Sequence, residues 1–583
     1  MSLYQIESIP FSVPGSYLTI GKQRDPLRVP VGAGGPRLVY RTCSSQAVSY
    51  RDTTFWAREF FEIALLRNGV EVPYHWAEHP ERLDLLAEGG GRASFTFMDL
   101  DTLLFETEGV QLRLLASKPM STTFSHRPGA ANIVDGFARC HHLFSAPEGG
   151  DVCVAIPPGD LGHTHRSGIP YQVDFNGTAG AIRLSRYEQH FDDSLPGFET
   201  AAGDWLTRWQ AWLEKIPAVP AAYREAAEQA WYLLWSSEVA PAGKLTRPTV
   251  LMSKYWMNSI WSWDNCFNAL SIARANPELA WGQLLLFFEH LDPGGIAPDQ
   301  INDLYEHYCF TKPPIQGWTI MKLVDKLGAQ ASRPYIEQLY APMTRLTEWW
   351  YRMRDFDGDG VCQYHHGNDS GWDNSTAFDH GYPTESPDLS AHLALQCEGL
   401  AEMAELLGRL DEAEHWRQRA KKQVQDLLAH SLRDGRFVSL RDGSHDSQAS
   451  LSLLNYIPLE LGRRLPEKVR ANLTADLQPG GLWLTDHGLA TEVPSSPKYE
   501  PAGYWRGPIW GPSTYQIVDG LIDAGEIALA RTIAQRFCDM CVHSPGFWEN
   551  YDALTGLGLD CPGYTWTAAA FLLMAEWLWE VSI

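Results

Sequence analysis

The chain has 583 residues, and 47 Lys and Arg stand against 71 Asp and Glu, so its formal net charge is −24. No run of Lys or Arg forms a patch that could neutralise phosphates, which argues against nucleic acid and anionic membranes as partners. No stretch approaches the roughly 20 apolar residues that span a bilayer, and the first residues lack the basic flank and apolar core of a signal peptide. We therefore expect a soluble, cytoplasmic protein with one large and one smaller domain.

Residues 1–200 predict an antiparallel β-sandwich domain. Short alternating runs, such as 110–114 and 151–154, lie between clusters of Gly, Pro and Asp, as strands and turns do. The hydrophobic period then changes to that of a helix over 204–213, and two prolines interrupt it soon afterwards. Residues 201–220 are therefore predicted to form a helical linker.

Residues 221–583 predict a domain built from helices. About 12 helical stripes fit into roughly 360 residues if the weaker ones are included. Short turns alternate with long loops rich in Gly, Asp and Trp, which is typical of a barrel of helical hairpins whose long loops gather at one end. The clearest stripes are 221–239, 280–290, 332–355, 389–407, 412–428, 514–524, 526–541 and 565–579.

The first of three aromatic-rich loops has the sequence YWMNSIWSWDN. Trp261 and Trp263 would cover the C–H faces of a sugar, while Asp264 and Asn265 would exchange hydrogen bonds with its hydroxyls. The 23 Trp and 23 Tyr of the chain favour the same ligand class, because flat rings with a polar tip suit sugar faces. A structural alternative is that Asp264 caps the helix predicted over 266–275 and the tryptophans are core.

The second loop contains Asp373, which follows Trp372 in the run GNDSGWDNS. An indole ring and a glycine-containing backbone would desolvate the carboxyl group and raise its pKa towards the working pH, as a general acid requires.

The same segment opens with DFDGDG, in which Asp355, Asp357 and Asp359 resemble the first half of a calcium loop. The twelfth position is His366 and not the usual Glu, so an EF-hand is not expected. Two interpretations stay open: a structural Ca²⁺ held by the three carboxylates, or an Asp/Gly turn.

The third region combines the runs YWRGPIWGP, FWENYD and GYTW. Glu549 is flanked by aromatic residues in a non-helical stretch, and Arg506 lies among rings and prolines that would hold its guanidinium rigidly. A fixed Arg can hydrogen-bond sugar hydroxyls or keep a carboxylate ionised. Taken singly, each residue is as compatible with a structural role as with a functional one.

These motifs resemble glycoside hydrolase family 63, which includes processing α-glucosidase I and its bacterial relatives, with the trehalases of family 37 as cousins. The resemblance implies an (α/α)6-barrel catalytic domain over 221–583, preceded by the β-sandwich. Six runs match in family order along the helical half: WDN (263–265), PPIQGW (313–318), SGWDNS (370–375), YWRGPIW (504–510), ENY (549–551) and YTW (564–566).

By this resemblance, Asp373 is the acid that protonates the glycosidic oxygen. Glu549 is then the base that activates a water on the opposite face of the anomeric carbon, which inverts its configuration. Carboxyl groups in such pairs lie roughly 6.5–9.5 Å apart, which leaves room for the water. This chemistry requires no metal or organic cofactor.

The resemblance also implies a subsite for the non-reducing sugar, with Trp372 and Trp510 as its walls. Lys312 is a departure, because relatives often have Gln at this position before the paired prolines. The other predicted binding residues are Trp261, Trp263, Asp264, Asn265, Gln316, Trp318, Asn374, Trp505, Arg506 and Trp566.

The leading hypothesis is an inverting, exo-acting α-glucosidase that hydrolyses a short α-linked oligosaccharide or a small glucoside. A second hypothesis keeps the mechanism and changes the substrate to mannosylglycerate, glucosylglycerate or trehalose. Two hypotheses from other classes are a sugar-binding protein without catalysis and a helical interaction scaffold whose tryptophans are core. A small carbohydrate is the expected partner, while the linkage, the leaving group and the oligomeric state are left open by the sequence.

Overall fold

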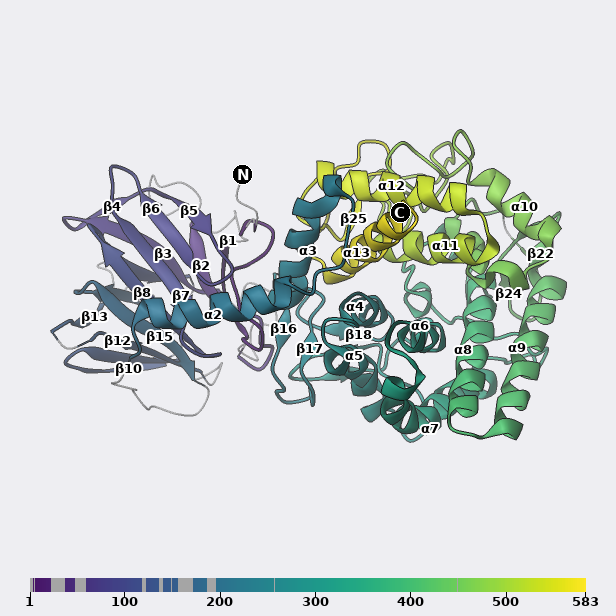
Figure 1. The fold of residues 1–583 in the computed structure, drawn as a ribbon, viewed down its shortest axis with the longest axis horizontal. Helices are drawn as coiled ribbons and strands as arrows, with labels where there is room; N and C mark the ends of the chain where they lie inside the picture. Colours follow the sequence, from purple (N-terminus) through teal and green to yellow (C-terminus); the bar gives the residue numbers. More distant parts are fainter. Residues whose placement is uncertain are drawn as a thin grey trace. The chain divides into compact units, whose positions relative to one another are not determined.

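The computed structural model describes residues 4, 6–22, 37–47, 59–117, 122–135, 140–147, 149–155, 171–185, 195–255, 257–447 and 449–582. The chain divides into two compact units (Figure 1). Unit 1 comprises Met1–Glu214, Trp235–Ala242 and Ser253–Asn258, and unit 2 comprises Lys215–Leu234, Gly243–Met252 and Ser259–Ile583.

Unit 1 contains two antiparallel sheets, as predicted for the first 200 residues. The first has the order β1-β2-β3-β9-β14-β13 with β4 on β3, and the second has the order β10-β11-β12-β15-β8-β7-β6-β5. The strands are β1 (Leu18–Lys22), β2 (Leu38–Thr42), β3 (Glu59–Arg67), β4 (Val70–Val72), β5 (Tyr74–Glu78), β6 (Leu83–Ala87), β7 (Arg92–Phe97), β8 (Thr102–Glu108), β9 (Gln111–Ala116), β10 (Thr122–Arg127), β11 (Ala130–Asp135), β12 (Cys140–Ser145), β13 (Val152–Ala155), β14 (Gln172–Phe175) and β15 (Ala179–Ser185).

Aromatic side chains from the two sheets meet in the core of unit 1. The ring centroid of Phe105 on β8 lies 4.6 Å from that of Phe175 on β14, and Phe61 on β3 lies 5.6 Å from Phe144 on β12, both edge to face. Each contact joins one sheet to the other, which is the packing of a sandwich. Helix α2 (Phe198–Leu213) packs against β7 and β8.

Within the described residues, six helices of unit 2 form a closed inner ring, in which each packs against the next and the last against the first (Figure 1). Along the chain they alternate with helices of an outer layer, which makes an (α/α)6 barrel. The inner helices are α4 (Asp264–Ile272), α6 (Gln316–Leu327), α8 (Pro387–Leu406), η5 (Leu453–Arg464), α11 (Gly511–Ala524) and α13 (Thr565–Glu580). The outer helices are α3 (Arg224–Ser236), which follows η2 (Ala221–Tyr223), α5 (Pro277–Glu289), α7 (Ala329–Met353), α9 (Leu410–Ser431), α10 (Glu467–Asp476) and α12 (Ile527–His543).

Sequence character decides which helix lies in which layer. The inner helix α13 is apolar over most of its surface and is buried along most of its length, whereas the outer helix α9 buries only one stripe. The inner helices α6 and α8 cross at Gly317 and Gly399, where a Cβ on Gly399 would lie 2.6 Å from the Cα of Gly317. Glycine is therefore required for this close approach.

Short elements connect the helices. No helix in the described part of the chain is both long enough and apolar enough to cross a membrane. The short elements are β16 (Glu238–Val239), β17 (Thr249–Val250), β18 (Ile260–Trp261), β19 (Gln300–Ile301), β20 (Glu306–His307), η3 (Gly367–Ser370), η4 (Thr376–Phe378), β21 (Thr384–Glu385), β22 (Leu432–Arg433), β23 (Arg436–Phe437), β24 (Leu440–Arg441), β25 (Asn550–Tyr551) and β26 (Gly558–Leu559).

The predicted helical stripes are helices in the structure, with shifted ends. Helices α5 and α8 begin a few residues before their predicted starts. Their first turns contain Pro277 and Pro387, and proline is tolerated at this position of a helix. Helices α6, η5 and α10 had no predicted bounds. Element η5 contains Pro458 and a non-helical Gly462, so its sequence lacks a regular stripe.

Candidate active site

The three aromatic-rich loops converge in unit 2. The ring of Trp372 from the second loop lies 4.5 Å from that of Trp505 in the third, and Trp263 from the first loop lies 5.8 Å from Trp566. Trp505 in turn stacks on Trp510 at 4.0 Å, with an interplanar angle of 7°. The tryptophans therefore form one continuous cluster; Trp256 of the first loop lies outside the described residues.

The loop that carries Asp373 is anchored by a buried carboxylate that the sequence analysis did not single out. Asp369 lies in η3, and its Oδ2 accepts hydrogen bonds from Arg354 at 2.9 Å and from the backbone N–H of His365 at 2.8 Å. Its Oδ1 accepts from the N–H of Thr311 at 3.0 Å. This one side chain thus fixes the acid loop to the segment that carries Lys312.

Glycine brings the acid loop against the first tryptophan. Gly371 has φ +74°, and a Cβ there would lie 2.6 Å from Cζ2 of Trp263. Only glycine combines this left-handed backbone with such a close ring. Because Asp373 follows two residues later, the contact sets the position of the carboxyl group.

Asp373 is partly buried and faces a cation. Its Oδ1 lies 3.9 Å from Nζ of Lys312, and 30% of its side chain is exposed. Burial raises the pKa of Asp373, while the positive charges of Lys312 and His366 lower it. Burial outweighs both charges, so the shift is in the direction predicted for a general acid.

Glu549 is almost fully buried and is held by a tyrosine. The hydroxyl of Tyr504 donates to Oε1 of Glu549 at 2.9 Å, from a non-glycine residue with φ +62°. Backbone strain of this kind persists where the surroundings over-determine it. Burial raises the pKa of Glu549 to about 8, the hydrogen bond from Tyr504 lowers it, and the charges of Asp560 and Asp373 raise it.

Asp264 is a third buried carboxyl group at the site. It is the first residue of α4, whose N-cap is Trp263 without a side-chain cap bond, so the predicted capping role is wrong. Burial raises the pKa of Asp264 to about 7, Lys312 lowers it, and Asp373 and Asp299 raise it. Within the described residues its Oδ2 has no hydrogen-bond partner, which leaves an acceptor for a ligand.

Lys312 is the cation that Asp264, Asp299 and Asp373 share. It is 9% exposed, adopts φ +69°, and donates from Nζ to the backbone oxygen of Asn368 at 2.9 Å. It lowers the pKa values of Asp264, Asp299 and Asp373. In the sequence, Lys312 stands out only as a departure from relatives, and nothing local to it indicates this central position.

Two predicted sugar ligands use their polar groups inside the protein. Asn265 is fully buried and donates to Oε1 of Gln283 at 2.9 Å. Trp318 donates from Nε1 to Asp519 at 2.9 Å. Asn265 and Trp318 therefore support α4 and α6 through these bonds, while Oδ1 of Asn265 has no partner among the described residues, and their contact with sugar stays a prediction.

Two further predicted ligands tie the acid loop to the third loop. Asn374 donates to the oxygen of Gly503 at 3.0 Å and accepts from the N–H of Trp505 at 3.0 Å. Arg506 donates to the backbone oxygen of Asn374 at 2.8 Å and to Asp379 at 2.6 Å. Their polar groups hold protein segments together, and the sugar contacts of Asn374 and Arg506 stay predictions.

The remaining predicted ligands divide by exposure. Trp372, Trp505 and Trp510 are fully buried in the indole cluster, so the predicted walls Trp372 and Trp510 form its interior. Trp261 on β18 is half-buried. Gln316 donates from Nε2 to the backbone oxygen of Ser262 at 3.1 Å. Among the described residues, Oε1 of Gln316 and Nε1 of Trp566 have no hydrogen-bond partner.

The three aspartates of the predicted calcium loop form a turn. Oδ1 of Asp357 accepts from the N–H of Asp359 at 3.2 Å, and Oδ1 of Asp359 accepts from the N–H of Val361 at 2.8 Å. His366 caps η3 by accepting from the N–H of Asn368. Each of the three aspartates also offers a carboxylate oxygen within 4.8 Å of the others, so the turn and the Ca²⁺ interpretations both stay open.

Comparison with known proteins agrees with this arrangement. A family model described as a mannosylglycerate hydrolase MGH1-like glycoside hydrolase domain matches residues 257–567. The mannosylglycerate hydrolase of Thermus thermophilus is 25% identical over 54% of this chain and 93% of its own. The glucosylglycerate hydrolase of Mycolicibacterium hassiacum is 21% identical over 61% of this chain and 98% of its own.

Solved structures share the fold. A family 63 mannosylglycerate hydrolase from Thermus thermophilus in complex with glucose has a TM-score of 0.52 at 23% identity and covers 60% of this chain and 98% of its own. A bacterial glucoamylase complexed with acarbose has a TM-score of 0.61 at 12% identity, over 98% of this chain and 94% of its own. The family match covers more than half of the chain, from the first aromatic-rich loop to the start of α13, and the chain therefore belongs to the mannosylglycerate hydrolase MGH1-like glycoside hydrolases of family 63.

Proposed function

We propose that the chain is an inverting hydrolase of a glycosylglycerate, which releases α-linked mannose or glucose from glycerate. The relatives named above support this substrate class over the neutral glucoside of the leading sequence hypothesis. The observation that carries the proposal is Lys312, a buried ammonium group 3.9 Å from the predicted acid.

The position of Lys312 favours an anionic leaving group. A general acid protonates the glycosidic oxygen, so the group on the far side of that oxygen lies beside Asp373 and therefore near Lys312. A carboxylate there would form a charge-assisted hydrogen bond with the ammonium group, which is stronger than a neutral one. A neutral leaving group would provide no such bond.

In the proposed reaction, the carboxyl group of Asp373 gives its proton to the glycosidic oxygen as the bond to the anomeric carbon breaks. Glu549 takes a proton from a water whose oxygen bonds to that carbon from the opposite face. Glycerate leaves with a hydroxyl group, and the sugar leaves as the inverted anomer. The Tyr504 hydroxyl holds the Glu549 carboxyl group in place.

The charge of Asp373 raises the pKa of Glu549, so the two carboxyl groups are proposed to titrate as a coupled pair. Burial raises the pKa of Glu549 to about 8 and also raises that of Asp373, so the free protein keeps a proton on Glu549 at neutral pH. The proposed reaction requires that proton on Asp373. A bell-shaped pH profile reports the macroscopic pKa values of such a pair, whichever site holds the proton.

The test is proton NMR of the sugar product during hydrolysis of mannosylglycerate, glucosylglycerate, trehalose and a neutral α-glucoside. We expect initial release of the β-anomer from one or both glycosylglycerates, and little turnover of the neutral compounds. Faster turnover of the neutral α-glucoside would overturn the substrate class, and initial release of the α-anomer would overturn the inverting mechanism.

A further inference from the structure

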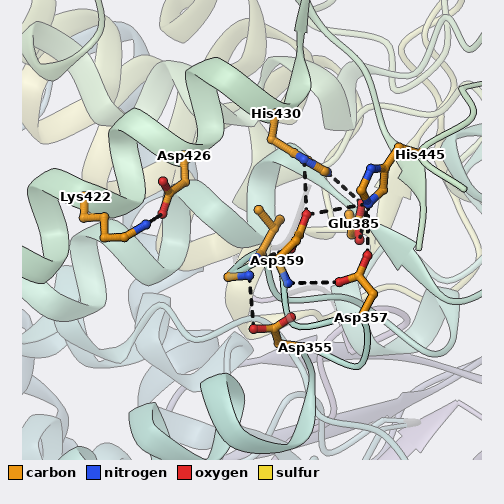
Figure 2. A network of polar contacts seen from close by, with 10 residues as sticks. Asp355, Asp357, Asp359, Glu385, Lys422, Asp426, His430 and His445 are labelled. Atoms are coloured by element: carbon orange, nitrogen blue, oxygen red, sulfur yellow. Dashed lines mark hydrogen bonds and ion pairs between the residues drawn. The ribbon is translucent and has the colours of Figure 1, made fainter. Parts of the chain in front are cut away.

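A second cluster of reactive side chains forms where four separate segments of unit 2 meet (Figure 2). Asp357 and Asp359 come from the turn after α7, and Glu385 comes from β21. His430 is in the last turn of α9, and His445 follows β24. Two imidazoles thus join the aspartates for which the sequence left a structural Ca²⁺ and an Asp/Gly turn open.

The distances in the cluster converge on one point. Oδ2 of Asp359 lies 3.5 Å from Nδ1 of His430 and 3.6 Å from Nε2 of His445. Oε1 of Glu385 lies 3.7 Å from the same Nε2 of His445. One donor atom from each of these four residues lies within 4.8 Å of every other.

The buried carboxylate of Glu385 provides a second, independent observation. Glu385 is fully buried, and its Oε2 accepts from Nε2 of His430 at 2.7 Å. Its Oε1, which faces His445, has no hydrogen-bond partner in the part of the chain that the structure describes. A buried carboxylate oxygen without a partner costs free energy unless a cation satisfies it.

The hydrogen bond between Glu385 and His430 also selects the ligand atom. If Nε2 of His430 donates to Glu385, then Nδ1 carries a lone pair directed towards Asp359. Metal-bound histidines usually donate their other N–H to a carboxylate in this way, which fixes the tautomer and the ring orientation.

We propose that Asp359, Glu385, His430 and His445 bind a divalent transition metal ion of the Zn²⁺ class. Zn²⁺ takes imidazole nitrogen and carboxylate oxygen in tetrahedral sites with ligands about 2.1 Å away, which separates the ligand atoms by about 3.4 Å. The three distances of 3.5, 3.6 and 3.7 Å fit such a tetrahedron. Ca²⁺ takes oxygen ligands, so two imidazoles count against it.

Charge favours the same ion. The carboxylates of Asp355, Asp357, Asp359, Glu385 and Asp442 lie in overlapping groups of possible ligands, against two imidazoles that are neutral when they bind a metal. Oδ2 of Asp357 lies 3.0 Å from Nε2 of His445, and metal binding at this nitrogen would replace that hydrogen bond. A dication would offset part of this negative charge.

The metal would act as a structural clamp. It would join the turn after α7, strand β21, the end of α9 and the turn after β24, which come from distant parts of the sequence. The turn after α7 leads into the acid loop, and Asp359 in this turn precedes Asp373 by fourteen residues. The ion would therefore stabilise the frame of the acid loop and take no part in hydrolysis.

The test uses the full chain after dialysis against a chelator, titrated with Zn²⁺, Co²⁺ or Ca²⁺. We expect one equivalent of Zn²⁺ to bind and to raise the midpoint of thermal unfolding. Co²⁺ should give the intense visible absorption of a tetrahedral ion. The variant His445→Ala should lose the Co²⁺ spectrum and weaken Zn²⁺ at least tenfold, because it removes a ligand that is 39% exposed and therefore dispensable for folding.

The matched control is His415→Ala, which removes an exposed histidine from the same helix, α9, as His430. This variant should bind metal as the parent protein does. The proposal is overturned if neither Zn²⁺ nor Co²⁺ binds with unit stoichiometry. It is also overturned if His445→Ala binds these ions as tightly as the parent protein does. It is equally overturned if Ca²⁺ binds more tightly than Zn²⁺ and His445→Ala leaves that binding unchanged, since the site would then be the aspartate turn alone.

Discussion

At the scale of single residues, the two proposed catalytic carboxyl groups differ in how they are held. Glu549 is buried under the hydroxyl of Tyr504, whereas Asp373 keeps part of its side chain exposed beside Lys312. The general acid, Asp373, needs this exposure because the leaving group must fit beside it. The base, Glu549, acts on one water and needs no such space. The difference predicts that the two substitutions will respond differently to the leaving group.

Replacing Asp373 by Asn should lower kcat for a glycosylglycerate by about 10²–10⁴-fold, because the amide cannot donate the proton. For a fluoride or nitrophenyl glycoside, whose leaving group needs no proton, the loss should be much smaller. Glu549→Gln should be equally slow on both substrate types, since both need an activated water. Steady-state kinetics with unchanged circular dichroism checks this, and equal losses for the two variants on both substrates would contradict the assigned roles.

Substitution of Lys312 should affect the binding of a glycosylglycerate more than the chemical step. Lys312→Met keeps an unbranched side chain, one atom shorter, and removes its charge, so KM for a glycosylglycerate should rise by about 10–150-fold, the equivalent of a charge-assisted hydrogen bond of about 1.5–3 kcal/mol. Turnover of an aryl glycoside should change little. Because Lys312 lowers the pKa of Asp373, its loss raises that pKa, and the acid should stay protonated to higher pH. The alkaline limb of kcat/KM should therefore move upwards.

Lys326→Met is the matched control, because Lys326 pairs with Glu576 on α13, at the end of α6 opposite Gln316. It should leave both KM values and the pH profile unchanged. If Lys312→Met raises KM for the aryl glycoside as much as KM for the glycosylglycerate, Lys312 supports the fold of the site and does not recognise an anion.

At the scale of elements, the acid loop depends on a backbone that only glycine adopts. In Gly371→Ala, the new methyl group would meet the Trp263 ring at 2.6 Å in a strained conformation with φ +74°. We expect kcat to fall by at least tenfold while the barrel stays folded, as followed by tryptophan fluorescence and thermal unfolding. Gly408→Ala has a nearly equal φ of +76° and open space around it, so it should keep its activity. Similar activity in both variants would show that the ring contact does not position Asp373.

The sequence predicted elements better than it predicted contacts. Apolar stripes indicated most barrel helices, and the order of motifs placed the three loops together, because both signals are local in the chain. Hydrogen-bond partners are not local: Asn265 faces Gln283 and Arg506 faces Asp379, and neither partner can be identified from the neighbouring sequence. The aspartate turn was visible in the sequence, whereas His430 and His445 join it only through the fold. The one signal for Lys312 was its departure from relatives within a motif that lines the site.

At the scale of the whole molecule, the buried carboxyl groups of the site lower the free energy of unfolding at neutral pH. Burial raises the pKa of Asp264 to about 7 and that of Glu549 to about 8, well above the values of about 4 in an unfolded chain. A group whose folded-state pKa is raised contributes stability that is present below its unfolded pKa and is lost as the pH rises through the folded pKa. A tenfold difference in acidity between the folded and unfolded states corresponds to about 1.4 kcal/mol. The free energy of unfolding should therefore fall between pH 4 and pH 8.

The variant that carries Asp264→Asn and Glu549→Gln tests this directly. Its side chains do not ionise, so it should match the parent protein in thermal stability near pH 4 and exceed it increasingly towards pH 8. The exposed substitution Glu348→Gln on α7 serves as the control and should follow the parent curve. Unfolding midpoints measured across this pH range decide the matter: parallel curves for the parent and the double variant would mean that the two carboxyl groups are solvated and ionised in the folded protein. A double variant that gains stability while losing turnover would instead show that the buried carboxyl groups are kept for catalysis.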